Sequence, residues 1–240
     1  MQKRIIKVVD TLAPTFDAIA NQTIEATDSS PFDWTTLIKN VEDNSSDLTY
    51  TVETDSVMYK IPGTYSVSVS VKDPSENTTT KSFQVTVEDT RAPVFSGLET
   101  IEHHYGDPNP DLLAGVTGYD VVDGDLSEAI SVDYSSVDYT TVGSYEVLYT
   151  VSDSRENTNT TKVTLEVMDE KAPSLTLSGE NTVRVELGET YTEAGATCED
   201  NYDSSCEVTV ESEVDDTTLG TYSVHYKALD SSGNETLKTR

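Results

Sequence analysis

Carboxylates at regular spacing are the side chains of this sequence best suited to chemistry. The segment Asp-x-x-Ala-Pro begins at Asp10, Asp89 and Asp169, so it recurs after 79 and then 80 residues. A turn that starts with Asp and ends with Asn recurs in the same order, at Asp73–Asn77, Asp153–Asn157 and Asp230–Asn234. An acidic loop between these two motifs contributes Asp43 in the first copy, Asp120 and Asp123 in the second, and Asp200 and Asp203 in the third.

So many side-chain oxygens point to a hard divalent cation. Ca²⁺ takes about six to eight oxygen ligands, and carboxylates gathered at one point repel each other unless a positive charge lies among them. The candidate calcium ligands are Asp10, Asp43, Asp73, Asn77, Asp89, Asp120, Asp123, Asp153, Asn157, Asp169, Asp200, Asp203, Asp230 and Asn234. The alternative is that Asp and Asn occur in these turns because they hydrogen-bond to their own backbone.

The elements that would carry these residues read as β-strands. Apolar and polar residues alternate over Tyr65–Val71, Tyr145–Val151 and Tyr222–Ala228, which is typical of half-buried strands. A second alternating run follows, as in Phe83–Val87 and Val163–Val167. The turn between two such runs predicts a hairpin.

Motifs that recur in one order three times define a sequence repeat. A unit of this size suits a single β-sandwich domain. The predicted domains are residues 10–88, 89–168 and 169–240, with the last strand of the third cut short at Arg240. Residues 1–9 are predicted to be the tail of a preceding repeat or a donor-like strand, because Arg4–Asp10 resembles Val163–Asp169.

The combined pattern resembles bacterial Ig-like repeats, the tandem sandwich modules of cell-surface adhesins, S-layer-associated proteins and secreted multidomain enzymes. The resemblance is carried by the Asp-x-x-Ala-Pro segments, the acidic turn Asp120–Asp125, the run from Gly143 to Asp153, and the turn Asp230–Asn234. The Tyr that follows Gly in each copy also resembles the tyrosine corner of immunoglobulin-type sandwiches. A weaker resemblance is to cadherin repeats, whose linkers bind calcium.

The resemblance implies an all-β fold of three tandem immunoglobulin-like β-sandwich domains in an elongated rod. In such a sandwich the start of the domain, the acidic loop and the last hairpin lie at one pole. The carboxylates of each repeat are therefore expected to come together there.

Charge and hydropathy exclude several classes of partner. Lys and Arg number 15 against 44 Asp and Glu, and the formal net charge of −29 repels nucleic acids and anionic lipid headgroups. No apolar run reaches the roughly 18–20 residues that cross a bilayer, so we expect no membrane span. Cys198 and Cys206 flank the third acidic loop; in an extracellular protein a disulfide between them is favoured, and free thiols are the alternative.

Catalytic motifs are missing, and we predict that the chain is not an enzyme. There is no Gly-x-Ser-x-Gly elbow, and neither His103-His104 nor His225 recurs in every repeat. The two adjacent histidines are expected to be an exposed pair on a strand. Phe32–Ile38, with Trp34, is expected to be a buried strand rather than a helical turn.

These features predict a non-catalytic stalk or spacer of a bacterial surface protein or adhesin, stiffened by calcium at its domain junctions. It would be extracellular or at the cell surface, associated with the cell wall or S-layer, with neighbouring repeats of the same or a longer chain as partners. One alternative is an adhesin module that binds a host glycan or protein, with Tyr119, Tyr134 and Tyr139 as the first candidates. Another is a filament subunit in which Ile5–Val9 completes the third repeat of another copy.

Overall fold

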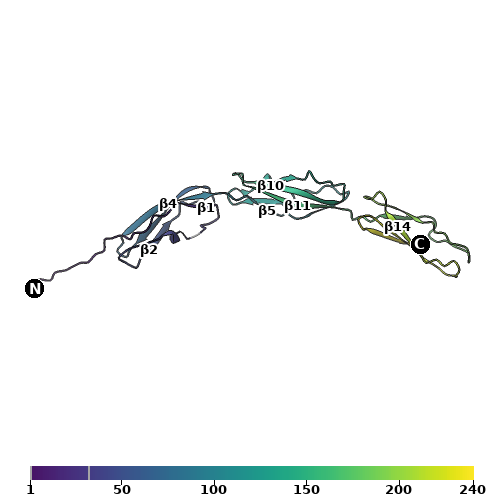
Figure 1. Ribbon diagram of the computed structural model, residues 1–240, viewed down its shortest axis with the longest axis horizontal. Helices are drawn as coiled ribbons and strands as arrows, with labels where there is room; N and C mark the ends of the chain where they lie inside the picture. The colour runs from purple at the N-terminus through teal and green to yellow at the C-terminus, as the bar shows by residue number, and fades with distance from the viewer. Residues whose placement is uncertain (1, 32) are drawn as a thin grey trace. The chain divides into compact units, whose positions relative to one another are not determined.

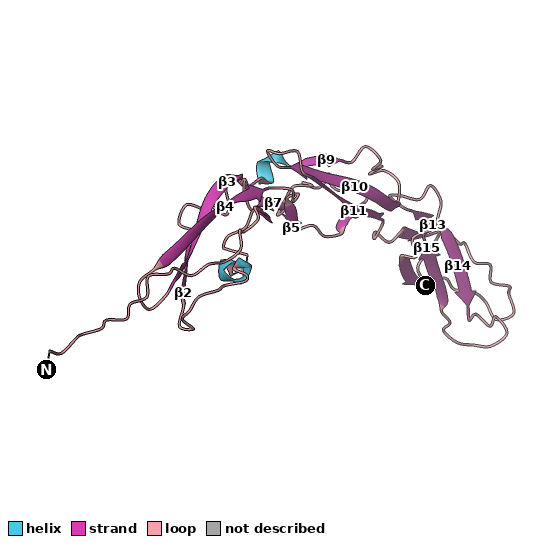
Figure 2. Cartoon of the chain, turned by 60° about the vertical axis from the view of Figure 1, so that its left-hand side comes forward, coloured by secondary structure: helices cyan, strands magenta, loops and turns pink. Residues whose placement is uncertain are grey.

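Strands dominate the protein, and the all-β prediction is confirmed. A computed structural model describes residues 2–31 and 33–240, and two compact units divide them. The first comprises residues up to Gly97 together with 115–131 and 149–161, and the second comprises 98–114, 132–148 and 162–240. The two short helical turns lie among strands and loops (Figure 2). The division into three domains at Asp89 and Asp169, and the rod, stay predictions.

The strands follow the three sequence repeats in chain order (Figure 1). The first repeat contains β1 (Gln22–Glu25), the 3₁₀ turn η1 (Trp34–Leu37), β2 (Thr49–Glu53), β3 (Gly63–Lys72) and β4 (Thr78–Glu88). The second contains β5 (Val94–Ser96), β6 (Ile101–His104), β7 (Thr117–Asp120), β8 (Gly124–Asp125), η2 (Ser127–Ala129), β9 (Ser131–Asp133), β10 (Gly143–Ser152) and β11 (Thr158–Met168). The third contains β12 (Ser174–Leu177), β13 (Ala196–Glu199), β14 (Glu207–Ser212), β15 (Val224–Leu229) and β16 (Glu235–Thr239).

The first repeat has a four-stranded sheet in the order β1-β4-β3-β2. β3 and β4 form the predicted hairpin, whose ladder runs from Gly63 opposite Val87 to Lys72 opposite Thr78. Alternate residues of β3 point into the core, so its valines are fully buried. The serines between them point outward, and Ser68 and Ser70 exchange hydrogen bonds with Ser82 and Thr80 across the hairpin.

The second repeat carries two sheets, in the orders β6-β11-β10-β9 and β5-β7-β8. The inward residues of β10 and β11 are again buried: Val147, Tyr149, Val151, Leu165 and Val167. The third repeat carries β12-β13 and β14-β15-β16, with a smaller core of Leu175, Val224, Tyr226 and Ala228. In all three repeats the Asp-to-Asn turn joins the two strands of a hairpin: β3 to β4, β10 to β11 and β15 to β16.

A tyrosine corner closes each repeat, as the Gly-x-Tyr pattern suggests. The hydroxyls of Tyr65, Tyr145 and Tyr222 donate hydrogen bonds of 2.7, 2.8 and 2.9 Å to carbonyls four residues earlier in the chain. Each ring lies next to the glycine two residues earlier. A Cβ there would meet the ring at an ordinary distance at Gly63 and Gly143, but tightly, at 3.1 Å, at Gly220.

Replacing Tyr145 with Phe should therefore destabilise the second repeat modestly. The change removes one hydroxyl donor and leaves the Thr141 carbonyl without it, which costs about 0.5–1.5 kcal/mol of unfolding free energy. Urea unfolding followed by NMR signals of β10 would measure the loss. A variant as stable as wild type would contradict the structural role of this hydrogen bond.

Two local expectations were wrong. Residues 34–37 form a 3₁₀ turn instead of a strand, because the Asp33 carboxylate accepts from the Thr35 N–H and caps the turn; Phe32 lies outside the described residues. His103 is buried, with its ring edge-on to Tyr139 at a centroid distance of 5.0 Å, so the two histidines are not an exposed pair.

Of the described helices, none is long and apolar enough to cross a membrane.

Candidate metal centres

Each hairpin turn is held by the two residues that define its motif. The Asn backbone N–H donates to Oδ1 of the Asp, at 2.9, 2.9 and 2.7 Å in the three repeats, and the Asn side-chain Nδ2 donates to Oδ2, at 2.8, 2.7 and 2.8 Å. The residue before Asn has a positive φ in all three turns: 70° at Glu76, 68° at Glu156 and 92° at Gly233. Only Gly233 adopts that conformation without strain. The same turn forms three times because the Asp–Asn pair overrides the unfavourable Glu.

The Asn also joins the hairpin to the start of its own repeat. Its Nδ2 lies within 3.4, 3.3 and 3.0 Å of the backbone carbonyl oxygens of Asp10, Asp89 and Asp169. The leading Asp and the hairpin Asp are therefore brought together by one side chain. This convergence was expected from the sandwich topology.

Replacing Asn157 with Asp should release this junction. The variant loses both Nδ2 donors and adds a negative charge beside two buried carboxylates, Asp89 and Asp153. We expect the second repeat to lose about 2–4 kcal/mol of unfolding free energy, because charged hydrogen bonds are lost and like charges are added. Thermal unfolding monitored by circular dichroism at neutral pH would show a lower midpoint. Asn109→Asp, at an exposed position of the same repeat, is the control.

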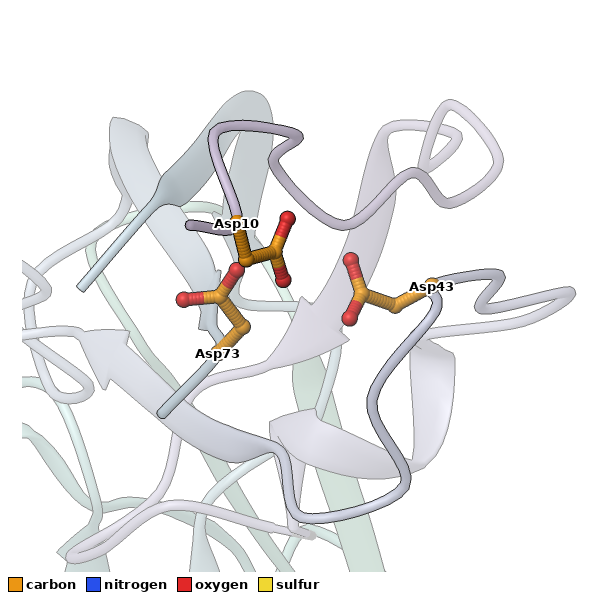
Figure 3. Close-up of side chains that lie close together, drawn as sticks. All are labelled: Asp10, Asp43 and Asp73. Atoms are coloured by element: carbon orange, nitrogen blue, oxygen red, sulfur yellow. The ribbon is translucent and has the colours of Figure 1, made fainter. Parts of the chain in front are cut away.

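Three carboxylates meet in each repeat. The groups are Asp10, Asp43 and Asp73; Asp89, Asp123 and Asp153; and Asp169, Asp200 and Asp203, with one oxygen of each residue within 4.8 Å of the others. Figure 3 shows the first group: Asp10 precedes the strands, Asp43 comes from a loop, Asp73 comes from the end of β3, and the three carboxylates face one another. Residues far apart in the chain thus form each group.

The loop aspartates have two different roles. Asp120 Oδ1 accepts from the backbone N–H groups of Val122 and Asp123, at 2.7 and 3.0 Å, and Asp200 Oδ1 accepts from Tyr202 and Asp203 in the same way, at 2.8 and 2.9 Å. These bonds shape the loop so that the second Asp faces the other carboxylates. The alternative that loop aspartates hydrogen-bond to their own backbone therefore holds for Asp120 and Asp200.

The second loop Asp is tied to the hairpin in two repeats only. The backbone N–H and hydroxyl of Ser154 donate to Asp123, and those of Ser231 donate to Asp203. The first repeat has Pro74 at this position, and proline has neither donor. Asp43 accepts instead from Ser45 in its own loop. The sequence signal for this contact was the residue after the hairpin Asp, and our sequence reading missed it.

Two of the predicted aspartate ligands, Asp120 and Asp230, lie outside the three groups. Asp230 is buried and paired with Asn234, and the third group contains Asp200 in its place. Asp120 is also buried, and its charge raises the pKa of the neighbouring Asp89. The side chains of Asn77, Asn157 and Asn234 donate to the hairpin Asp.

In the second group, burial and neighbouring negative charges shift the pKa of one carboxylate upward. Burial raises the pKa of Asp89, and the charges of Asp120 and Asp153 raise it further. Arg155 opposes these effects weakly, with its Nε 3.9 Å from Asp89 Oδ2. Burial also acts to raise the pKa of Asp153, but hydrogen bonds from Asn157 outweigh it and the pKa is lowered.

Three carboxylate oxygens are buried without a hydrogen-bond donor: Oδ2 of Asp89, of Asp169 and of Asp200. Asp89 and Asp169 are 8% and 6% exposed. A buried charged oxygen without a hydrogen-bond donor costs folding free energy, so each is a place where a bound cation would contribute strongly. An all-oxygen set also fits Ca²⁺ better than Zn²⁺, which prefers nitrogen and sulfur ligands.

The third acidic loop is additionally fixed by a covalent bond. Cys198 at the end of β13 and Cys206 just before β14 form a disulfide, with their Cα atoms 6.0 Å apart. Asp200 and Asp203 lie in the segment that the disulfide closes. A closed loop has fewer alternative conformations, which holds these two carboxylates near Asp169.

Two proteins similar in sequence to this chain come from a phage and from a bacterium. The chain is 29% identical over 191 residues to an uncharacterized 81.3 kDa protein of Acholeplasma phage L2, covering 77% of this chain and 24% of the phage protein. It is also 29% identical over 196 residues to the pesticidal crystal protein Cry22Aa of Bacillus thuringiensis, covering 78% and 26%. The chain thus spans about a quarter of the length of these two relatives.

Solved structures overlap with the chain at low TM-scores. The protocadherin gammaB4 extracellular domain gives a TM-score of 0.35 at 13% identity, over 95% of this chain and 48% of that one. The CBM51-2 and INT domains of Clostridium perfringens ZmpB give 0.28 at 16%, over 60% and 25%.

A family model described as "Bacterial surface protein, Ig-like domain" matches residues 95–167 and 175–240. Together these matches cover more than half of the chain, and they coincide with the second and third sequence repeats. The chain therefore belongs to the family of bacterial surface protein Ig-like domains.

Proposed function

We propose that the chain is a non-catalytic, extracellular stalk or spacer module of a bacterial surface protein, stiffened by Ca²⁺ at its three carboxylate groups. The observation that carries the proposal is the recurrence of three converging carboxylates in every repeat, with donor-free buried oxygens on Asp89, Asp169 and Asp200. Membership of a surface-protein family supports the location. Association with a cell wall or S-layer is part of the proposal.

A cation at each group would tie a repeat to the segment that enters it. Asp10, Asp89 and Asp169 stand at the predicted boundaries, and the other carboxylates belong to the loop and hairpin of the repeat that follows. The chain's own residues would supply three carboxylates to each ion, and water would complete a coordination number of about six to eight. Binding at these positions would restrict the swing of one repeat against the next.

His103 and His104 both contact other side chains. The ring of His103 packs against Tyr139, and Nδ1 of His104 lies 3.3 Å from a carboxylate oxygen of Glu170. Nδ1 of His225, the third histidine, lies 3.0 Å from the hydroxyl oxygen of Thr239, so the non-catalytic role is proposed from the family match and not from the histidines.

Small-angle X-ray scattering of the whole chain would test the stiffening. We expect Ca²⁺ to lengthen the maximum dimension and narrow the distribution of shapes relative to EDTA. The matched control is the triple variant Asp43→Asn, Asp123→Asn, Asp203→Asn, which should scatter identically in both buffers. Wild-type curves that superimpose with and without Ca²⁺ would overturn the stiffening role.

Self-assembly is a second candidate, and a groove in the third repeat favours it. The groove has a volume of about 690 Å³, and Val183, Val185, Leu187 and Leu219 line it with exposed apolar side chains. Elsewhere β1 and β6 pair in parallel with the ends of β4 and β11. Among the described residues, no strand pairs with 183–187 in this way.

The segment Ile5–Val9 suits that groove, since its apolar side chains are strongly exposed. Lys7 within the segment and Lys3 and Arg4 before it are basic, and the groove includes Glu186, Asp215 and Asp216. Analytical ultracentrifugation of the 240-residue chain should then show concentration-dependent polymers that Ile6→Asp abolishes. A chain that is monomeric at every concentration would exclude this candidate.

Ligand binding by the second repeat stays a prediction. Tyr119 and Tyr134 are about half exposed, whereas Tyr139 packs against His103. A glycan array probed with the whole chain distinguishes this alternative, because a pure spacer binds none of the glycans.

A further inference from the structure

One position in the acidic loop contacts the preceding repeat in both places where a preceding repeat is described. It is the residue just before the second loop Asp: Val122 before Asp123, and Tyr202 before Asp203. The two loops have the same backbone hydrogen bonds, because the N–H of this residue and the N–H of the next both donate to the first loop Asp. The side chain at this position therefore starts from the same backbone conformation in both loops.

Tyr202 makes two contacts with the second repeat. Its ring lies edge-on to Tyr105, with centroids 5.0 Å apart and planes at 73°, which is a favourable geometry for an aromatic pair. Its hydroxyl accepts a hydrogen bond of 3.2 Å from the backbone N–H of Val142. Tyr105 directly follows β6 and Val142 directly precedes β10, so Tyr202 contacts two segments next to sheet strands. All three residues belong to the same compact unit.

Val122 occupies the equivalent position in the second repeat and packs against the hydrophobic core of the first. The first repeat has Glu42 there, and that side chain is exposed. The residue at this position is thus apolar or aromatic in the two repeats where it contacts the preceding repeat, and charged in the first repeat, where no preceding repeat is described. This pattern indicates a docking residue rather than a general requirement of the loop.

The loop around Tyr202 is also the loop of the third carboxylate group. Asp200 Oδ1 is used by the loop's own N–H groups, while Asp200 Oδ2 is buried without a donor beside Asp169 and Asp203. A cation bound by Asp200 and Asp203 would fix the chain on both sides of Tyr202. Loss of the cation would leave two repelling carboxylates flanking it.

We propose that Tyr202 is a latch that couples cation binding at Asp169, Asp200 and Asp203 to docking of the third repeat on the second. The inference rests on the proposed cation site. Coupling between two events is reciprocal, so the cation should tighten the Tyr202 contact, and the contact should raise the affinity for the cation. Val122 would act in the same way at the preceding junction.

Amide hydrogen exchange at Val142, measured by NMR on the whole chain, reports the latch directly, because its N–H donates to Tyr202. We expect saturating Ca²⁺ to slow this exchange about tenfold, a coupling within the usual range for two linked sites. Tyr202→Phe keeps the ring and removes the acceptor, so Val142 should exchange fast with or without Ca²⁺. Asp203→Asn keeps Tyr202 and should abolish the calcium response.

Two controls separate the latch from the cation site. Val122→Ala alters the other junction and should leave exchange at Val142 unchanged. Calorimetric titration with Ca²⁺ alone reports binding, and Tyr202→Ala should weaken the affinity of one site about fivefold. Calcium binding without any change at Val142 would overturn the latch and leave the proposed function intact. Protection of Val142 that is equal in EDTA and Ca²⁺ would also overturn the coupling, and an absence of calcium binding would overturn both proposals.

Discussion

Calcium added to the metal-free chain should raise the midpoint of thermal unfolding by several degrees, and EDTA should reverse the shift. A ligand that binds only the folded state stabilises it by RT ln(1 + [L]/Kd), about 2.7 kcal/mol per site at a hundred times Kd. The effect should be large here because the folded protein gathers three carboxylates in each repeat and buries donor-free oxygens among them. Circular dichroism near 217 nm, a general β-sheet signal, would follow the transition.

Charge-neutralised variants make this prediction sharper. Asp43→Asn, Asp123→Asn and Asp203→Asn each remove one charge from one group. The triple variant should unfold at a higher temperature than wild type in EDTA, because repulsion is relieved, and should not respond to Ca²⁺. Equal midpoints for wild type in Ca²⁺ and EDTA would rule out stabilisation by the ion.

The second large effect is expected in the core of the third repeat. Glu193 accepts hydrogen bonds from the hydroxyls of Tyr191 and Tyr226, and Arg240 Nη1 pairs with it at 2.5 Å. The Arg240 and Glu193 side chains are only 5% and 17% exposed. Glu193→Leu should cost about 3–5 kcal/mol of unfolding free energy, because it leaves a buried guanidinium without its partner.

Urea unfolding, followed by NMR signals of β15, would measure this loss for the third repeat alone. Glu211→Leu is the matched control, since Glu211 is an exposed residue of β14. It should change the stability by less than about 0.5 kcal/mol. A Glu193→Leu variant as stable as this control would show that the ion pair contributes nothing.

The same network gives the third repeat a defined pH dependence. Burial acts to raise the pKa of Glu193, but hydrogen bonds from Tyr191 and Tyr226 and the charge of Arg240 outweigh it, so the pKa is lowered. A lowered folded-state pKa adds stability that is present above the unfolded value of about 4.3 and disappears as pH falls through the folded value. Burial and the hydrogen bond to Glu193 raise the pKa of Tyr226 to about 12, so Tyr226 remains a donor throughout the neutral range.

The repeated motifs were enough to predict the all-β class and the convergence of carboxylates in each repeat. The Asp-to-Asn turns predicted hairpins because both side chains bond locally, and Asp73 with Asn77 does so. Convergence of Asp89, Asp123 and Asp153 followed from the topology of the sandwich. Such features depend on short-range chemistry or on the fold class.

Features set by single tertiary contacts could not be predicted. Two adjacent histidines gave no sign that Tyr139 would cover one of them. The apolar residues around Trp34 predicted a strand. Capping by Asp33 favours a 3₁₀ turn instead, and this effect outweighs the apolar pattern. The third group contains Asp200 in place of the hairpin Asp230. This difference depends on the conformation of the loop, which the spacing of the acidic residues does not predict.

Calorimetric titration of the metal-free chain with Ca²⁺ would show whether the three carboxylate groups bind the ion. We expect about three bound ions per chain, one for each carboxylate group, and about two for the variant Asp123→Asn with Asp153→Asn. A titration of the folded wild-type chain that shows no binding at millimolar Ca²⁺ would contradict this expectation.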